Sequence, residues 1–228
     1  MMETLELILR PAFGVAALAF LGLAVHVARA SPQHGNSVVG FVLFLVGTLV
    51  AGSAFSFGTQ DPNIYGIGRV LAFFASGFLP VAFYIVYREY TLGPPSTVLI
   101  ALLSVVPIAT TLLALTNSMH NIIWAAVETE SGLQFTHITD HYWFNRVHAP
   151  FMYGLLGFTL LALAGRLPTI ALAHRKTVIL LLGCTLLPFA VNIGNRLLGF
   201  GPPEFPFTAL TLALLLPLYA YASLSLRF

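Results

Sequence analysis

Amide and imidazole side chains enter an otherwise apolar chain at the end of the stretch 107–124, PIATTLLALTNSMHNIIW. The stretch begins at Pro107 as an apolar run, becomes polar at Asn117 and His120 without a break, and closes on Trp124. Amide, imidazole and indole groups can hydrogen-bond to a small molecule or stack on it, so they are suited to ligand binding. We therefore predict that a ligand or another signal enters the protein where this stretch leaves its apolar surroundings.

A second polar group follows Pro188 in the stretch LLPFAVNIGNRL. Asn192, Asn195 and Arg196 are spaced i, i+3 and i+4, so they share one face of a helix. Pro188 is expected to kink that helix, because proline removes a backbone hydrogen bond. Two interpretations stay open: the amides bond neighbouring helices structurally, or they line a ligand cavity.

Three arginines, Arg69, Arg146 and Arg196, lie at the ends of long apolar runs. Such a side chain can keep its stem among apolar groups while its guanidinium reaches lipid headgroups. Alternatively, the three converge on a pocket where they hold an anionic ligand or pair with Glu204. Arginine suits that role because its planar guanidinium donates two parallel hydrogen bonds to a carboxylate.

Histidines and aromatic residues are concentrated in the polar segment 118–146 and at its edges. His137 and His141 are spaced i, i+4 and could reach one metal ion if that segment were helical, but a closed zinc site needs about four ligands. They are weak metal candidates, and no resident metal is expected. The aromatic residues either anchor the chain at a membrane interface or form the wall of a binding pocket. They are Trp124, Tyr142, Trp143 and Phe144.

Catalytic patterns and cofactor attachment points are missing from the sequence. It has no usable Ser/His/Asp arrangement, no phosphate-binding glycine loop and no carboxylate pair within an apolar run, so we expect no enzyme activity in this chain. Covalent retinal requires a lysine inside a membrane span, and the single lysine, Lys176, lies at the end of one. We therefore exclude covalent retinal and expect no cofactor.

The composition requires these groups to be positioned by membrane helices. The chain is 58% hydrophobic and 8% charged, with a mean hydropathy of +0.90, whereas soluble domains carry about 25% charged residues. A net charge of +2 without a basic stripe argues against nucleic acid as a partner. The single cysteine, Cys184, excludes a disulfide within the chain. The lipid bilayer is therefore the first expected partner.

Seven apolar stretches are long enough to cross a bilayer, which takes about 20 residues each, and short connections rich in Pro and Gly separate most of them. We predict an all-α bundle of seven transmembrane helices that forms a single domain over residues 1–228, with a long outer loop at 118–146. The expected spans are about 9–28, 38–57, 70–88, 97–117, 147–165, 176–195 and 206–226.

Positive charge near the helix ends gives the expected orientation. Six basic residues fall on one side of the predicted bundle and four on the other, and cytoplasmic connections carry the excess of Lys and Arg. The N-terminus and the loop 118–146 are therefore expected outside, and the C-terminus in the cytoplasm of a prokaryotic cell, as a multi-pass protein of the cytoplasmic membrane.

Four motifs resemble the N-terminal seven-transmembrane sensor domain found ahead of histidine kinases and related diguanylate cyclases. They are RVLAFFASGFLPVAFYIVYREY around Pro80, PIATTLLALTNSMHNIIW, HAPFMYGLLG, in which Tyr153 precedes a glycine, and LLPFAVNIGNRL followed by GPPEFPFT. The positions that match the family pattern are Asn117, His120, Trp124, Pro188 and Asn192. The chain stops at Phe228, where a kinase or cyclase would begin, so any such output domain lies outside it, in a separate partner or beyond an excised sensor domain.

The resemblance implies a receptor for a small molecule or a membrane signal. We expect the signal to be read in the outer half and passed through the last span, 206–226, to a cytoplasmic signalling partner, with a homodimer possible as in histidine kinases. Two other functions stay open: a small-solute transporter, and a membrane assembly subunit without a ligand. The candidate ligand-binding residues are Asn117, His120, Trp124, Trp143, Arg146, Tyr153, Asn192, Asn195, Arg196 and Glu204.

Overall fold

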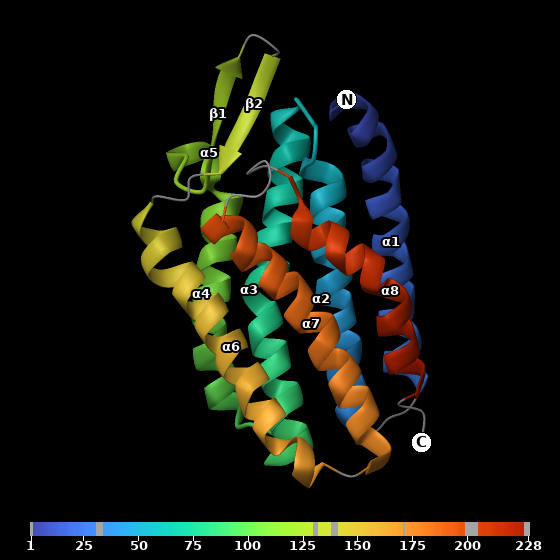
Figure 1. Ribbon diagram of the computed structural model, residues 1–228. Helices are drawn as coiled ribbons and strands as arrows, with labels where there is room; N and C mark the ends of the chain where they lie inside the picture. Colours follow the sequence, from blue (N-terminus) through green and yellow to red (C-terminus); the bar gives the residue numbers. More distant parts are fainter. Residues whose placement is uncertain are drawn as a thin grey trace.

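The computed structural model describes residues 2–30, 34–129, 132–137, 141–170, 172–198 and 205–225. Within these residues, seven long helices run side by side and a two-stranded hairpin projects from one end of the bundle (Figure 1). The helices are α1 (Met2–Ala30), α2 (His34–Ser56), α3 (Pro62–Thr91), α4 (Thr97–Leu115), α6 (Ala149–Arg166), α7 (Leu172–Leu198) and α8 (Phe207–Ser225).

Short elements fill the connection between α4 and α6 that the sequence marks as the long outer loop. The hairpin is antiparallel, with Trp124 opposite His137 and Thr129 opposite Gly132. We call the end of the bundle that carries it the hairpin end. The elements are α5 (Asn117–His120), β1 (Trp124–Thr129), β2 (Gly132–His137) and the π-helix η1 (Trp143–His148), and the 3-10 helix η2 (Leu167–Thr169) joins α6 to α7.

The helices confirm the predicted all-α membrane bundle. Six helices of the described chain are long and apolar enough to cross a membrane, and Phe207–Ala222 of α8 forms a shorter apolar helix. Some boundaries differ from the expected spans, most clearly for α3, which begins at Pro62. It begins there because Asp61 caps it: the carboxylate accepts the backbone N–H groups of Asn63 at 2.8 Å and Ile64 at 3.3 Å, which a helix start otherwise leaves unbonded.

Basic residues mark both edges of an apolar layer. Along four helical segments they recur at a spacing of about 20 residues, which spans about 30 Å at the α-helical rise and equals the thickness of a hydrocarbon core. The pairs are Arg10 and Arg29 on α1, Arg69 and Arg88 on α3, Arg146 and Arg166 across η1 and α6, and Lys176 and Arg196 on α7.

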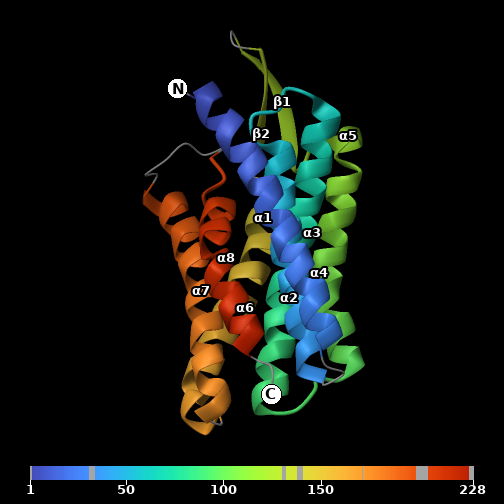
Figure 2. The same cartoon turned by 90° about the vertical axis from the view of Figure 1, so that its right-hand side faces the viewer.

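The two chain termini lie at opposite ends of this layer. The N-terminus is at the hairpin end and the C-terminus at the other (Figures 1 and 2), as an odd number of spans requires. That the hairpin end faces outward stays a prediction from the distribution of Lys and Arg.

Helices α1, α2 and α3 form the most tightly packed part of the bundle. Gly52 of α2 and Gly68 of α3 face each other so closely that a Cβ built on either would lie 2.6 Å from the other's carbonyl oxygen. Small residues at helix crossings allow such close backbone approach in membranes, where van der Waals packing drives association. This contact fixes the position of α3, which contributes to the hairpin end.

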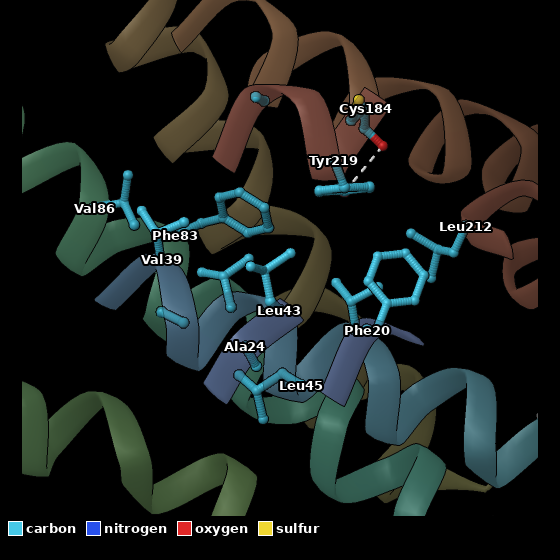
Figure 3. Close-up of a cluster of buried hydrophobic side chains, with 14 of the residues drawn as sticks. Phe20, Ala24, Val39, Leu43, Leu45, Phe83, Val86, Cys184, Leu212 and Tyr219 are labelled. Carbon is cyan, nitrogen blue, oxygen red and sulfur yellow. Dashed lines mark hydrogen bonds between the residues drawn. The ribbon is translucent and has the colours of Figure 1, made fainter. Parts of the chain in front are cut away.

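The main core lies where α1, α2 and α3 meet α7 and α8. Phe20, Leu43 and Phe83 point into it from α1, α2 and α3 (Figure 3). Tyr219 of α8 enters from the opposite side, packs edge-on against Phe20 at 5.6 Å between ring centres, and donates its hydroxyl to the Cys184 carbonyl at 3.2 Å. Helix α8 is therefore held between α7 and the tightly packed helices.

Candidate functional site

A buried polar group at the hairpin end joins α4 to the start of α6. Thr110 of α4 is fully buried, and its hydroxyl oxygen accepts the indole N–H of Trp143 at 3.1 Å. The same oxygen lies 3.2 Å from Nδ1 of His148, a residue that is 2% exposed. One threonine thus bonds the buried His148 and the partly buried Trp143, and buried polar groups require such partners.

The π-helix explains how Trp143 and His148 reach the same threonine. In an α-helix, two residues five positions apart point about 140° away from each other, because each residue turns the chain by about 100°. The wider π turn, with its i→i+5 bonding, brings such residues nearly into line. Segments of π-helix occur frequently at functional sites, and this one connects the hairpin to α6.

Aromatic rings surround this polar group. The His148 ring packs against Phe73 of α3 and Phe144 of η1, at 5.4 and 5.7 Å between ring centres. On the side of the hairpin, Phe135 of β2 stacks on Tyr65 of α3 at 4.3 Å, and Trp124 meets the edge of the same ring at 6.1 Å. The hairpin is therefore attached to α3 by aromatic contacts.

Arg69 of α3 lies beside these rings. Its guanidinium carbon is 5.9 Å from the centre of the Tyr65 ring and 5.2 Å from that of Phe73. Within about 6 Å a cation is attracted to the negative face of an aromatic ring. A positive charge is thus held at the hairpin end by ring faces.

Asn117 fastens the chain between α5 and β1. It is 2% exposed, and its side-chain oxygen accepts the N–H of Ile123 at 2.8 Å and of Trp124 at 3.3 Å. Its amide nitrogen donates to the Trp124 carbonyl at 2.9 Å. The turn itself passes through Asn121, which adopts a left-handed conformation with φ of 50°, tolerated by asparagine more readily than by most residues. The predicted pair Asn117 and Trp124 therefore meet, through the backbone of Trp124.

Replacement of Asn117 by alanine is expected to loosen the hairpin. Two backbone N–H groups and one carbonyl lose their partner, and an unsatisfied buried group costs about 1–3 kcal/mol. Hydrogen exchange of the Ile123 amide should therefore accelerate about tenfold or more, because 1.4 kcal/mol corresponds to a factor of ten. Ser118→Ala, at an exposed neighbour, is the matched control. Equal exchange in Asn117→Ala and wild type would refute this role.

His120 is engaged with its own turn. Its Nδ1 accepts the N–H of Ile122 at 3.1 Å, and its Nε2 lies 3.2 Å from the hydroxyl of Thr116. Because that hydroxyl donates to the Leu112 carbonyl at 2.9 Å, the histidine donates from Nε2. Both ring nitrogens are therefore used locally in this structure.

A second polar group crosses three helices. The hydroxyl of Tyr153 on α6 donates to the side-chain oxygen of Asn192 on α7. The amide nitrogen of Asn192 then donates to the hydroxyl of Thr208 on α8 at 2.8 Å. Pro188 lies one turn before Asn192 inside α7 and is buried. We call Tyr153, Asn192 and Thr208 the interhelical relay.

The remaining candidates lie in several places. Arg146 is exposed, Asn195 is partly buried on α7, and His141 accepts the N–H of Trp143 at its Nδ1 at 3.2 Å. His137 belongs to strand β2, so the helical spacing with His141 on which the metal candidate depended is not the structure of this segment. Glu204 and the side chains of Arg196 and His137 lie outside what the structure describes.

Thr110, His148 and Thr208 were not among the candidates, and Arg69 was raised only in the alternative in which three arginines converge on an anion pocket. Thr110 and Thr208 look like ordinary helical threonines in sequence, because only the fold gives them partners on other helices. The five-residue spacing of Trp143 and His148 is a usable signal only if a π turn is anticipated. Among the described residues, no group of three or more His, Cys, Asp or Glu side chains could hold a metal ion.

The fold defines a polytopic membrane protein with buried polar groups near one end. The family model of the N-terminal 7TM region of histidine kinase matches residues 12–228, and the chain belongs to this family. Neither the curated proteins nor the solved structures give a match. Membership makes the chain a sensor region of the prokaryotic cell membrane, a region that is not itself catalytic, and it implies a cytoplasmic signalling partner.

Proposed function

We propose that this chain reads a signal at its hairpin end and passes it through α8 to a cytoplasmic output such as a histidine kinase. The observation that carries the proposal is the interhelical relay, whose hydrogen bonds run from α6 through Asn192 to α8. The hairpin end then faces outward, in keeping with the excess of Lys and Arg on the opposite side.

The relay lies where hydrogen bonds can couple helices. Asn192 is about one turn, or 6 Å, inside Arg196, and Tyr153 is about 10 Å inside Arg146, so both lie within the apolar layer that the basic residues bracket. Water is scarce at that depth, and polar groups there bond to neighbouring helices. A displacement of α6 is then transmitted to α7 and α8 through these bonds.

The hairpin end is connected to this relay through α6. His148 precedes the first residue of α6, and Tyr153 follows one turn into it. A movement of η1 against Thr110 therefore carries Tyr153 with it. Pro188 gives α7 a position where bending is easy, because one backbone hydrogen bond is absent. The signal then emerges as a shift of α8, in a dimer of this chain if the output is a kinase.

The relay can be tested by measuring the position of α8 directly. Spin labels at Leu92 and Tyr221, which are 50% and 64% exposed, report the distance between α3 and α8 at the end opposite the hairpin. The background is Cys184→Ala, which keeps the backbone carbonyl that Tyr219 uses. In lipid nanodiscs, we expect Asn192→Leu to shift or broaden the distance distribution relative to the parent.

Two threonines of α8 supply the matched control. Thr208→Val removes a bond between helices, whereas the hydroxyl of Thr211 bonds only to the Phe207 carbonyl of its own helix at 2.7 Å. Thr208→Val should therefore resemble Asn192→Leu, and Thr211→Val should resemble the parent. Identical distributions for all four proteins would reject transmission through the relay, and solute flux into liposomes would favour a transporter instead.

A further inference from the structure

We infer that Arg69 binds the head of an amphiphilic anion at the hairpin end, either an acyl carboxylate or a phospholipid phosphate. The inference deepens the proposed sensing function and rests on it. Arg69 is partly buried, its guanidinium lies over Tyr65 and Phe73, and its Nε is buried without a hydrogen-bond partner.

Other partly buried arginines of the described chain are bonded differently. Each donates to a backbone carbonyl: Arg10 to Ala54 at 3.4 Å, Arg88 to Gly93 at 3.3 Å and Arg175 to Pro168 at 3.0 Å, although the Nε of Arg175 is also buried without a partner. Arg69 makes no hydrogen bond or ion pair among the described residues and contacts ring faces instead. A buried N–H without an acceptor is costly, and a bound oxyanion would satisfy it.

The acidic groups described at this end do not supply that acceptor. The Asp61 carboxylate caps α3, the Glu6 carboxyl group lies against Gly58, and Glu128 is exposed on the hairpin. The N–H donors of the Arg69 guanidinium therefore stay available to a ligand, and their planar arrangement matches the geometry of a carboxylate or a phosphate. Ring faces hold the cation without consuming its N–H donors.

Because Arg69 lies at the edge of the apolar layer, the anion that it binds is expected to carry an apolar chain. Arg69 lies about 10 Å along α3 from Pro62, at the edge of the apolar layer and next to aromatic rings. A small hydrated anion would lose its water there without compensation. An amphiphile instead places its head at the arginine and its chain in the hydrocarbon.

The two tryptophans of the chain provide the readout. Trp124 meets the ring of Tyr65 at 6.1 Å, and Trp143 is bonded to Thr110 beside His148. The full chain in uncharged dodecyl maltoside at low salt is titrated with decanoate, dioleoylphosphatidylglycerol or acetate while tryptophan fluorescence is recorded. We expect a saturable change with decanoate, with phosphatidylglycerol or with both, and at least tenfold weaker binding of the same amphiphile by Arg69→Gln.

Matched variants distinguish a loss of anion recognition from a failure to fold and from a general loss of positive charge. Arg69→Lys keeps the charge without the fork and should bind with intermediate affinity, and it decides the matter if Arg69→Gln does not fold. Arg10→Gln removes another partly buried arginine of the same end, whose Nε donates to the Ala54 carbonyl, and should bind as the wild type does. A response to decanoate alone identifies a free amphiphile as the source, and a response to phosphatidylglycerol alone identifies a membrane lipid.

Three results would overturn the inference: no saturable response to either amphiphile, equal affinity in wild type and Arg69→Gln, or acetate binding as tightly as decanoate. The spin-label measurement on Asn192→Leu involves no ligand. A negative binding result therefore leaves the relay untouched, and a negative distance result leaves Arg69 binding untouched.

Discussion

Gly52→Ala is expected to destabilise the bundle by about 2 kcal/mol, because overpacking of a tight contact typically costs about 1–3 kcal/mol. The added Cβ would lie 2.6 Å from the Gly68 carbonyl oxygen and 2.9 Å from the Ala72 nitrogen. Both atoms belong to backbone, so a side-chain rotation cannot relieve the clash and α2 must move away from α3. The midpoint of thermal unfolding should fall by several degrees.

The lone cysteine reports this unfolding. Cys184 is 2% exposed, so a thiol-reactive dye labels it only when the core opens. Gly22→Ala is the control, because a Cβ there meets nothing within 4 Å and alanine is the better helix former. We expect Gly22→Ala to unfold at or slightly above the wild-type midpoint. A Gly52→Ala protein as stable as Gly22→Ala would contradict the close crossing of α2 and α3.

Thr110→Val is expected to lower the stability of the hairpin end by about 2–4 kcal/mol. Valine has nearly the same shape but offers no oxygen, so the partly buried Trp143 indole N–H and Nδ1 of the buried His148 both lose their bond to the Thr110 hydroxyl. Each unsatisfied buried group costs about 1–3 kcal/mol. The fluorescence of Trp143 should change, and the amides of η1 should exchange faster.

Thr110→Ser separates the hydroxyl from packing. Serine keeps the oxygen and removes one methyl group, whose burial is worth about 1 kcal/mol. We expect Thr110→Ser to retain wild-type fluorescence and most of the protection from exchange. If serine and valine variants lose protection equally, the hydroxyl has no special role and only the packing of α4 against η1 matters.

The fold follows from the sequence because membrane helices are specified by length and polarity alone. Seven apolar runs and the turn-forming residues between them predict the helices, and the structure differs mainly where helices extend beyond the apolar layer. Asp61 and Pro62 carry the information for the early start of α3, but a hydropathy pattern does not register a cap. The hairpin is harder to foresee, since its attachment to the bundle includes the contacts of Phe135 and Trp124 with Tyr65, a residue distant in sequence.

The sequence predicts which asparagines take part in polar contacts, but it predicts the partners of the polar groups only in part. Asn117 and Asn192 stand out in apolar surroundings, and both are hydrogen-bonded, the first to backbone and the second across helices. Thr208, which accepts from Asn192, and the bonded pair Thr110 and His148 become significant only through contacts between elements that are distant in sequence. The spacing of His137 and His141 misled because periodicity cannot distinguish a strand from a helix in so short a segment.

The central claim is that a change confined to the hairpin end moves α8 at the opposite end. The most direct measurement is the distance between spin labels at Leu92 and Tyr221 in the Thr110→Val protein, with Thr110→Ser as control. We predict that valine changes the distance distribution and that serine leaves it as in the parent. A Thr110→Val protein whose η1 amides exchange faster while that distribution stays unchanged would contradict the claim.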